Sequence, residues 1–253
     1  MAQQTQLSRV VPAWHRFLAS FPTVAACATA PLGEVLIAWE GMGYNRRARN
    51  LHRAAGLVVS EHGGVVPDDL DALLALPGVG PYTARAVLAF AFERDVGVVD
   101  TNAGRVLARA VTGTTLRPAR AQAVVDAMVP PGRGWSFGQA LLDLGATVCT
   151  SRTPDCRACP IRRRCAWARA GCPDPDPARG SAGVSGRQSV FAGSDREGRG
   201  RLIAALRSGP VPRAEVATAS GWPDDVARAE RVATALVEEG LAARDVDGVL
   251  RLP

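Results

Sequence analysis

Residues 76–84, Leu-Pro-Gly-Val-Gly-Pro-Tyr-Thr-Ala, decide the fold because they mark a tight turn between two segments with helical patterning. Glycines at positions 78 and 80 allow a sharp turn. Backbone N–H groups at the start of the next helix can then hold a phosphate without a charged side chain. Taken alone, a Gly-x-Gly of this kind is more typical of an ordinary helix–helix turn. The sequence further downstream therefore decides between the two interpretations.

Four cysteines follow within 17 residues, in the order Cys149-x6-Cys156-x2-Cys159-x5-Cys165. Such a cluster of thiols indicates a metal centre. Zinc is the main alternative to an iron–sulfur cluster, since four thiolates also suit tetrahedral Zn²⁺, although the spacing is not the usual pair of Cys-x2-Cys knuckles. A disulfide framework is not expected in a cytosolic chain of this size. Five arginines lie in or between these cysteines and are expected to place positive charge near phosphates: Arg152, Arg157, Arg162, Arg163 and Arg164.

Between the turn and the cysteines, residues 99–106 read Val-Asp-Thr-Asn-Ala-Gly-Arg-Val. Asp100 ends an apolar run and opens a helix, which is the usual position of an N-cap. A capping role and a catalytic role for this carboxylate are compatible, so both interpretations stay open.

The surrounding pattern predicts a mostly α-helical protein, because Ala, Leu, Val and Arg recur at helical spacing with few strand-like alternations. Gly- and Pro-containing joints separate the expected helices. These helices cover residues 7–28, 32–56, 68–76, 81–92, 101–110, 118–128 and 135–148.

The end of the chain has a different composition. Residues 173–195 are rich in Pro, Gly, Ser and Asp and are expected to form a flexible linker. Residues 196–253 regain helical periodicity and close with two apolar runs around Asp247-Gly248, a favoured hairpin turn. Three helices and a hairpin predict a small winged-helix-like module.

The charge is uneven. All 30 cationic residues are arginine, and the net charge is +6. Residues 1–172 hold 19 arginines and 12 acidic residues, whereas residues 173–253 hold 11 and 12. The basic part suits a polyanion such as DNA, although a solvated arginine-rich surface is an equal alternative. No signal peptide or membrane-spanning run is expected, which predicts a cytoplasmic, nucleoid-associated protein.

Taken in this order, the three motifs resemble those of the MutY-type adenine glycosylases in the endonuclease III, or helix-hairpin-helix, superfamily. Further matching blocks cover essentially residues 1–170: QQTQ (3–6), GMGYNRRARNLHRAA (41–55), HGG (62–64) and FGQALLDLGATVC (137–149). The resemblance implies an all-α fold with a six-helix barrel over residues 1–110 and an iron–sulfur domain over 111–172. It also implies a [4Fe-4S] cluster on the four cysteines.

The resemblance implies roles for individual residues. Asp100 would stabilise the positive sugar that forms as the base leaves, with Tyr82 and Asn102 beside it and Gln139 lining the base pocket. Gln4 would wedge into the gap left by a base flipped out of the duplex. The expected DNA contacts also include Thr5, Gly78, Gly80, Arg46 and Arg49.

Tyr82 stands where endonuclease III relatives carry a lysine that attacks the sugar. Since the chain contains no lysine, lyase chemistry through a lysine is excluded, and a monofunctional glycosylase is expected. A packing role is the alternative for Tyr82.

The sequence also departs from the family. The family motif Glu-Val-Met-Leu-Gln-Gln-Thr-Gln places its acid-catalytic Glu two positions before Met1, so the chain as given is expected to be close to inactive. The C-terminal module is also too short for the Nudix-like domain with which typical members read 8-oxoguanine.

The expected substrate is double-stranded DNA with adenine opposite 8-oxoguanine or guanine, bound by a monomer with no membrane partner. Two alternatives remain. One is a glycosylase for thymine or uracil mispaired with guanine, and the other is a protein that only binds DNA.

Overall fold

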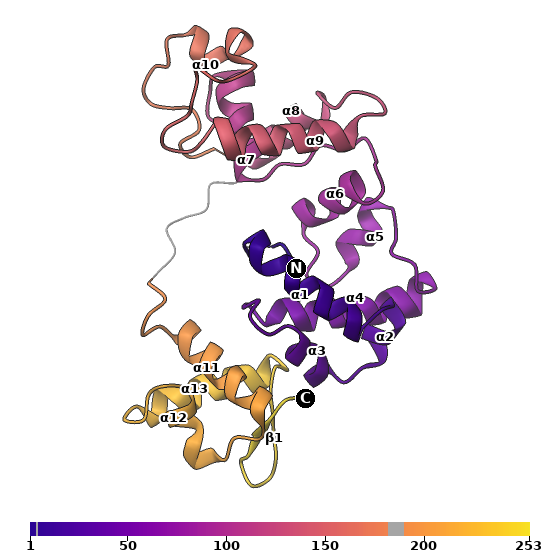
Figure 1. Cartoon of the computed structure of the whole chain (residues 1–253), viewed down its shortest axis with the longest axis vertical. Helices are drawn as coiled ribbons and strands as arrows, with labels where there is room; N and C mark the ends of the chain where they lie inside the picture. Colours follow the sequence, from indigo (N-terminus) through magenta and orange to yellow (C-terminus); the bar gives the residue numbers. More distant parts are fainter. Residues whose placement is uncertain (4, 182–189) are drawn as a thin grey trace. The chain divides into compact units, whose positions relative to one another are not determined.

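The computed structural model describes residues 1–3, 5–181 and 190–253, and the described chain is mainly helical (Figure 1). It divides into two compact units. Unit 1 consists of residues 1–67, 76–78 and 188–253, and unit 2 of residues 68–75 and 79–187. These units differ from the domain boundaries expected from the sequence, because the first and last parts of the chain fall into one unit.

Unit 1 begins with four helices: α1 (Leu7–Ser20), α2 (Val24–Thr29), α3 (Leu32–Ala38) and α4 (Arg46–His62). The C-terminal module adds three helices, α11 (Asp195–Ser208), α12 (Val216–Ala219) and α13 (Val226–Glu238). It also contains a 3-10 turn, η4 (Arg213–Glu215), and a sheet of two strands, β1 (Ala243–Arg244) and β2 (Leu250–Arg251). The strands are antiparallel, with Ala243 opposite Arg251. The predicted hairpin turn is confirmed, with Gly248 at a φ of 79°.

Two long helices expected from the sequence were predicted wrongly, because each is interrupted. The first breaks after α1, where Thr23 caps α2 by accepting a hydrogen bond from the N–H of Ala26 at 3.0 Å. The second breaks between α3 and α4, where Gly41 and Gly43 adopt φ values of 76° and 66°. Such left-handed backbone ends a helix, and the apolar periodicity had continued through both breaks.

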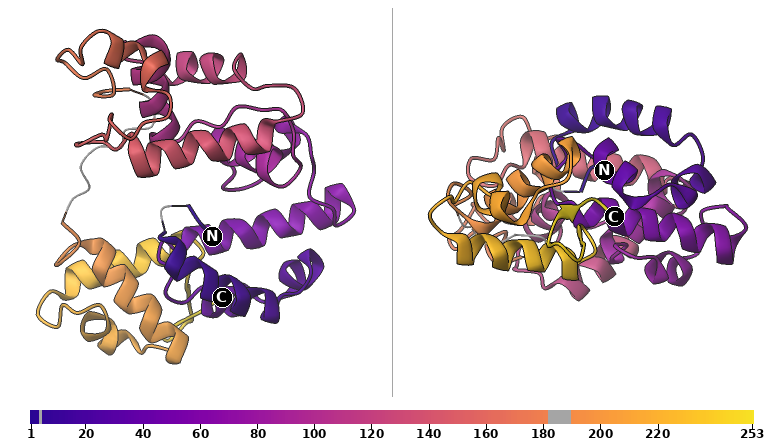
Figure 2. Two further views of the ribbon diagram at one scale, coloured as in Figure 1. Left: turned by 45° about the horizontal axis from the view of Figure 1, so that its top comes forward. Right: turned by 90° about the horizontal axis from the view of Figure 1, so that it is seen from below.

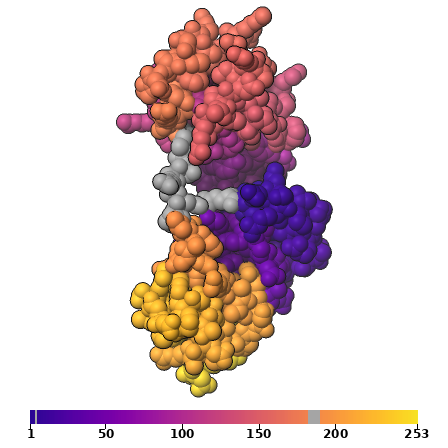
Figure 3. All heavy atoms as spheres, turned by 60° about the vertical axis from the view of Figure 1, so that its left-hand side comes forward, coloured from indigo at the N-terminus to yellow at the C-terminus, as the bar shows by residue number. Residues whose placement is uncertain are grey.

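The core of unit 1 is shared between the N-terminal helices and the C-terminal module. Phe17, Leu36 and Trp39 belong to the same buried cluster as Leu202 and Leu236. The other views show α11–α13 beside α1–α4 (Figure 2), and the surfaces of the two groups adjoin in the space-filling view (Figure 3). The C-terminal module is therefore an integral part of unit 1 and is not a separately tethered domain.

Unit 2 contains α5 (Leu70–Ala75), α6 (Pro81–Phe90), α7 (Thr101–Val106), α8 (Pro118–Asp126), α9 (Gly134–Asp143) and α10 (Ala166–Arg169). Two π-helical segments continue α7 and α9, η1 (Leu107–Thr112) and η2 (Leu144–Val148), and a 3-10 turn, η3, covers Arg162–Arg164. Its core includes Ala103, Leu107, Ala121, Val125 and Leu141.

The start of the predicted linker is folded. Ala178 and Ser181 are buried, and the Ser181 hydroxyl accepts a hydrogen bond from the N–H of Leu116 at 3.0 Å while donating to the carbonyl of Pro177 at 2.6 Å. Residues 173–181 thus pack into unit 2, although their composition predicted flexibility. Within the described residues, no helix is long and apolar enough to cross a membrane.

Candidate active site and cysteine cluster

The turn that decided the fold joins α5 to α6. Gly78 has a φ of 80°, a left-handed conformation that favours glycine. A Cβ there would also lie only 2.8 Å from the Cβ of Asn50, so both the backbone conformation and the packing require glycine at this position. Gly80 precedes α6, has a φ of −95°, and a Cβ there would meet nothing within 4 Å. Neither conformation nor packing therefore requires glycine at position 80. A bare backbone at the start of a helix instead leaves room for a close ligand such as a phosphate.

Asp100 caps α7, as its sequence position indicated. One carboxylate oxygen accepts from the N–H of Ala103 at 2.7 Å, and the other accepts from the side-chain amide of Asn102 at 3.1 Å. Capping fixes the orientation of the carboxylate and leaves it half-buried. The capping role is thus observed, and it leaves a catalytic role possible.

Tyr82 lies near Asp100. Burial, and secondly the negative charge of Asp100, raise the pKa of the Tyr82 phenol, which therefore stays protonated at neutral pH. The ring is 43% exposed. It lines an open hollow together with Arg85, Val99 and Gln122. The charge of Asp100 therefore acts on Tyr82, and these two residues are the main candidates for the active site.

Asn102 connects Asp100 to a buried arginine that the sequence analysis missed. Its Oδ1 accepts from Nη2 of Arg105 at 2.8 Å. Arg105 also donates to the carbonyl oxygens of Cys149 at 2.6 Å and Gly145 at 2.5 Å. A Cβ at position 145 would lie 2.7 Å from the Cβ of Asn102, so this glycine allows α7 and η2 to approach closely.

Gln139, the candidate for the base pocket, is half-buried on α9. It is not among the residues that line the hollow beside Tyr82. Asp100 and Asn102, which are joined by a hydrogen bond, do not line it either. The role of Gln139 in the base pocket therefore stays a prediction.

The four cysteines of the motif line a single hollow of unit 2, with an empty volume of about 390 Å³ that includes its open side. Apolar side chains form much of the wall, among them Leu144, Ile161 and Trp167. Burial, and after it the charge of Cys172 and then those of the other three motif cysteines, raises the pKa of the Cys156 thiol, so Cys172 also lies near this group. Among the described residues, however, no three His, Cys, Asp or Glu side chains already form a metal-binding geometry.

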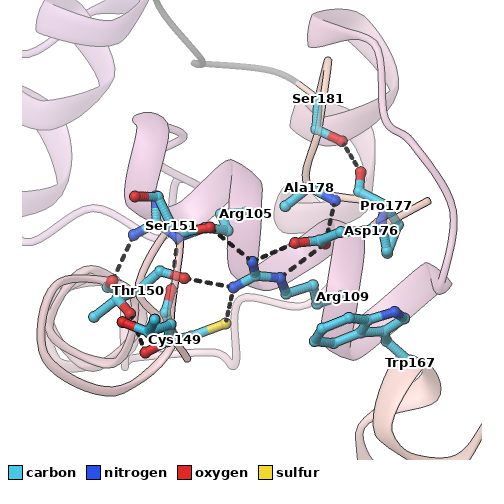
Figure 4. Close-up of polar contacts among 12 residues, drawn as sticks. Arg105, Arg109, Cys149, Thr150, Ser151, Trp167, Asp176, Pro177, Ala178 and Ser181 are labelled. Atoms are coloured by element: carbon cyan, nitrogen blue, oxygen red, sulfur yellow. Dashed lines mark hydrogen bonds and ion pairs between the residues drawn. The ribbon is translucent and has the colours of Figure 1, made fainter. Parts of the chain in front are cut away.

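Arg109 holds this region together, and no sequence pattern had singled it out (Figure 4). Its side chain is 1% exposed and pairs with Asp176 at 2.5 Å. It also donates to the carbonyls of Thr150 and Ser151, at 2.7 and 3.1 Å, and to the Cys149 sulfur at 3.5 Å. Burial alone would lower the pKa of Arg109, but its hydrogen bonds to Asp176 and Cys149 raise it, so the guanidinium stays charged.

The predicted DNA contacts of unit 1 have internal partners. Arg46 forms two hydrogen bonds with the carboxylate of Glu239, at 2.7 and 2.5 Å, and Arg49 donates to the backbone carbonyl of the same residue. The side-chain hydrogen bonds from Arg46, and after them the one from Arg199, lower the pKa of Glu239 to about 2. Gln4 lies outside the described residues.

Arg47 is a further residue that the sequence analysis did not assign. It donates to the hydroxyl of Thr5 at 2.9 Å and to the carbonyls of Met1 and Met42, at 2.9 and 2.8 Å. Its guanidinium also lies 5.3 Å from the ring centre of Trp39. Arg47 thereby ties the N-terminal residues to the loop before α4.

Comparison with known proteins gives consistent matches. Residues 1–123 match the family described as HhH-GPD superfamily base excision DNA repair protein. The adenine DNA glycosylase of Mycobacterium tuberculosis (strain CDC 1551 / Oshkosh) is 45% identical over 262 residues, covering 100% of this chain and 83% of that protein.

Two solved structures are similar in fold. A thermostable thymine-DNA glycosylase has a TM-score of 0.61 at 28% identity, covering 66% of this chain and 80% of its own. A trapped endonuclease III–DNA covalent intermediate has a TM-score of 0.59 at 25% identity, covering 68% and 82%.

Proposed function

The chain belongs to the adenine DNA glycosylases of the HhH-GPD superfamily of base excision DNA repair proteins, and we propose that it removes adenine mispaired with 8-oxoguanine or guanine in duplex DNA. The observation that carries the proposal is the 45% identity to an adenine DNA glycosylase over the whole chain. The fixed carboxylate of Asp100 at the start of α7 and the lack of lysine agree with it. It acts as a monofunctional hydrolase and as a monomer on DNA.

In the proposed reaction, the bond between C1′ of the sugar and the adenine nitrogen breaks, and its electron pair leaves with the base. The base takes up a proton, and water adds to C1′ to leave an abasic site. The carboxylate of Asp100, held by the N–H of Ala103 and by Asn102, stabilises the positive charge that develops on the sugar. Tyr82 contacts the sugar and supplies no nucleophilic amine.

The test measures strand cleavage after alkali on duplexes carrying adenine opposite 8-oxoguanine, adenine opposite guanine, or thymine or uracil opposite guanine. It uses the 253-residue chain and a form with Glu-Val added before Met1, where the resemblance places a glutamate. Adenine release by either form supports the proposal. Release of thymine or uracil instead, or binding without any base release by both forms, contradicts it.

The role of Asp100 is tested by Asp100→Asn, which keeps the shape but removes the charge. The rate of adenine release should fall by at least about 100-fold, the usual effect of losing one electrostatic contact to a transition state. The exposed Asp71 of α5 provides the control, since Asp71→Asn should leave the rate unchanged. Equal rates in both variants would exclude the assigned role.

We also propose that Cys149, Cys156, Cys159 and Cys165 hold a [4Fe-4S] cluster. Their donor chemistry fits such a group: four thiols line one hollow, and the Cys149 and Cys165 sulfurs accept hydrogen bonds from Arg109 and from the N–H of Ala168, each at 3.5 Å. When bound, the cluster would cross-link the loop between η2 and α10 and supply a redox-active centre.

The cluster is tested by measuring iron and sulfide in protein purified without oxygen. Four irons and four sulfides per chain are expected, with loss of iron in Cys156→Ser. Cys172→Ser is the control, because Cys172 lies outside the motif, and it should retain iron. Stoichiometric zinc in place of iron would contradict the proposal.

Finally, we propose that residues 196–253 form a winged-helix-type module. The proposal is supported by the order of its elements: α11, a bridge between Val211 and Leu250, α12, α13 and the β1–β2 hairpin.

A further inference from the structure

The loop that joins α3 to α4, residues 39–45, depends on side-chain contacts for its shape. Its two glycines and Tyr44 have left-handed backbone, with a φ of 48° at Tyr44, so the helical hydrogen-bond ladder does not continue through it. Within the loop, the indole N–H of Trp39 donates to the carbonyl of Gly43 at 3.1 Å. Further contacts to the two ends of the loop come from the C-terminal module.

Arg207 of α11 connects both ends of this loop. Its Nε donates to the carbonyl of Leu36 in the last turn of α3, and its Nη2 donates to Oδ1 of Asn45, directly before α4, each at 3.0 Å. The last carbonyls of a helix have no partner inside the helix, and an arginine can cap them. One half-buried side chain of the module therefore holds together the two helix ends that the loop joins.

Asn45 gives an independent indication. It is the N-cap residue of α4, a position at which asparagine normally accepts a hydrogen bond from the backbone of its own helix. Among the described residues, its side chain forms no such cap bond. Its oxygen accepts from Arg207 instead. The residue best suited to cap α4 is thus used for a contact with the module.

The module also holds the helices on either side of the loop. The carboxylate of Glu239 accepts two hydrogen bonds from Arg46, at 2.7 and 2.5 Å, in the first turn of α4. At the start of α3, the N–H of Gly33 donates to the carbonyl of Pro253 at 2.8 Å. A Cβ at position 33 would lie 2.7 Å from that oxygen, so this close approach requires glycine.

Arg47 links the loop to the beginning of the chain. It donates to the carbonyl of Met42 inside the loop at 2.8 Å. The same guanidinium donates to the carbonyl of Met1 and to the hydroxyl of Thr5, each at 2.9 Å. Because Arg47 lies in the first turn of α4, a displacement of the loop would also displace its contacts with Met1 and Thr5.

From these contacts we propose that the C-terminal module positions the loop of residues 39–45 and, through Arg47, the first residues of the chain, with Arg207 as the positioning residue. Arg207 acts through Asn45 and does not itself contact the substrate. Residues that bind a substrate need such support to keep their geometry. The effect on adenine release rests on the proposed function, whereas the effect on the loop does not.

The first test is hydrogen exchange in the full chain. Arg207→Met keeps an unbranched apolar stem and removes both donated bonds. The amides of Met42, Arg47 and Ala48, which form hydrogen bonds in and beside the loop, should exchange about tenfold faster, the factor expected for one or two lost hydrogen bonds. Amides of α13 should keep their rates. Arg231→Met, an exposed position of α13, is the control and should change neither set.

Two outcomes of the exchange experiment would overturn the proposal. One is an unchanged exchange rate of the loop in Arg207→Met. The other is an equal acceleration throughout unit 1, because this would show a general loss of stability and no specific support of the loop.

A double-mutant cycle tests whether Arg207 acts through Asn45. Asn45→Ala removes the acceptor oxygen and should by itself accelerate exchange of the loop. Added to Arg207→Met, it should accelerate exchange less than twofold further, because both substitutions remove the same contact. Fully additive effects would show that the two side chains act independently and would overturn this step.

Base release provides a measurement that a change in stability alone does not alter. The chain with Glu-Val before Met1 is mixed, in excess, with a duplex carrying adenine opposite 8-oxoguanine, well below the unfolding temperature of each variant. Arg207→Met should release adenine at least about tenfold more slowly, since a small displacement far from the chemistry can cost a large factor in rate. Arg231→Met should keep the original rate.

Equal rates of release in Arg207→Met and Arg231→Met would overturn the role of Arg207 in the reaction. A lack of release by the original sequence would contradict the proposed function instead. In that case the exchange rates still decide whether the module holds the loop.

Discussion

Asn102 accepts a hydrogen bond from Arg105 at 2.8 Å, and Asn102 in turn donates to the carboxylate of Asp100. Arg105 is buried and also donates hydrogen bonds to the backbone carbonyls of Gly145 and Cys149. The position of the candidate catalytic carboxylate thus depends on an arginine that would not itself touch the substrate. Arg105 is a positioning residue.

Arg105→Ala should lower the free energy of unfolding by about 1–3 kcal/mol, because it leaves buried acceptors without a donor. It should also slow adenine release, since Asn102 loses the contact that holds it. Urea unfolding and base release measure the two effects. The exposed Arg120 of α8 gives the control: Arg120→Ala should change stability by no more than about 0.5 kcal/mol.

The buried pair of Arg109 and Asp176 predicts a large effect of a small substitution. Asp176→Ala leaves the guanidinium charged in a buried site, which should cost about 3–5 kcal/mol. The exposed pair of Arg94 and Asp68 in the same unit is a matched comparison, and Asp68→Ala should cost at most about 1 kcal/mol. Chemical denaturation of both variants measures the difference, and equal costs would show that Arg109 finds other partners.

Glu239 predicts a loss of stability in acid. Its pKa is about 2 in the folded protein, against about 4.3 in an unfolded chain. The unfolded state therefore takes up the proton first, so the stabilisation is complete above about pH 5 and is lost as the pH falls towards 2. Glu239→Gln should be less stable than the original chain at neutral pH, and the difference should shrink in acid. A pH-independent difference in unfolding free energy would contradict this assignment.

The absence of lysine allows a gain-of-function experiment at Tyr82. In Tyr82→Lys, the side-chain amine can attack C1′ as the bond to the base breaks, giving an imine that borohydride reduces to a stable amine link. A covalent protein–DNA adduct is therefore expected on gel electrophoresis. Arg85→Lys places a lysine in the same hollow but beside Asp126, with which Arg85 pairs at 2.9 Å. It should give no adduct. A covalent adduct with both variants would show that attack on the sugar does not depend on position 82.

The features that the sequence predicted are local ones. The turn at Gly78, the cap at Asp100 and the hairpin at Gly248 each depend on the conformation of a few consecutive residues, which glycine and aspartate specify strongly. The grouping of the four cysteines in one hollow was also expected, because they lie close in the sequence.

The features that the sequence did not predict depend on contacts between residues that are far apart in the chain. Arg46 and Arg49 were assigned to DNA as members of a motif, yet both contact Glu239, some 190 positions further on, and only the folded chain brings these residues together. Arg109 had no local signal, because its partner Asp176 lies in a segment whose composition suggested flexibility. The break between α3 and α4 was missed because apolar spacing says nothing about left-handed glycines.

The shared core of unit 1 also has a consequence for biosynthesis. Phe17 and Leu36 pack in one cluster with Leu236 and Leu250, so the core of unit 1 includes contacts of high sequence separation and cannot be completed until Leu250 has left the ribosome. Unit 2 is nearly continuous in sequence, and its local contacts can form while synthesis continues. During translation the first helices therefore expose apolar surface that is covered last.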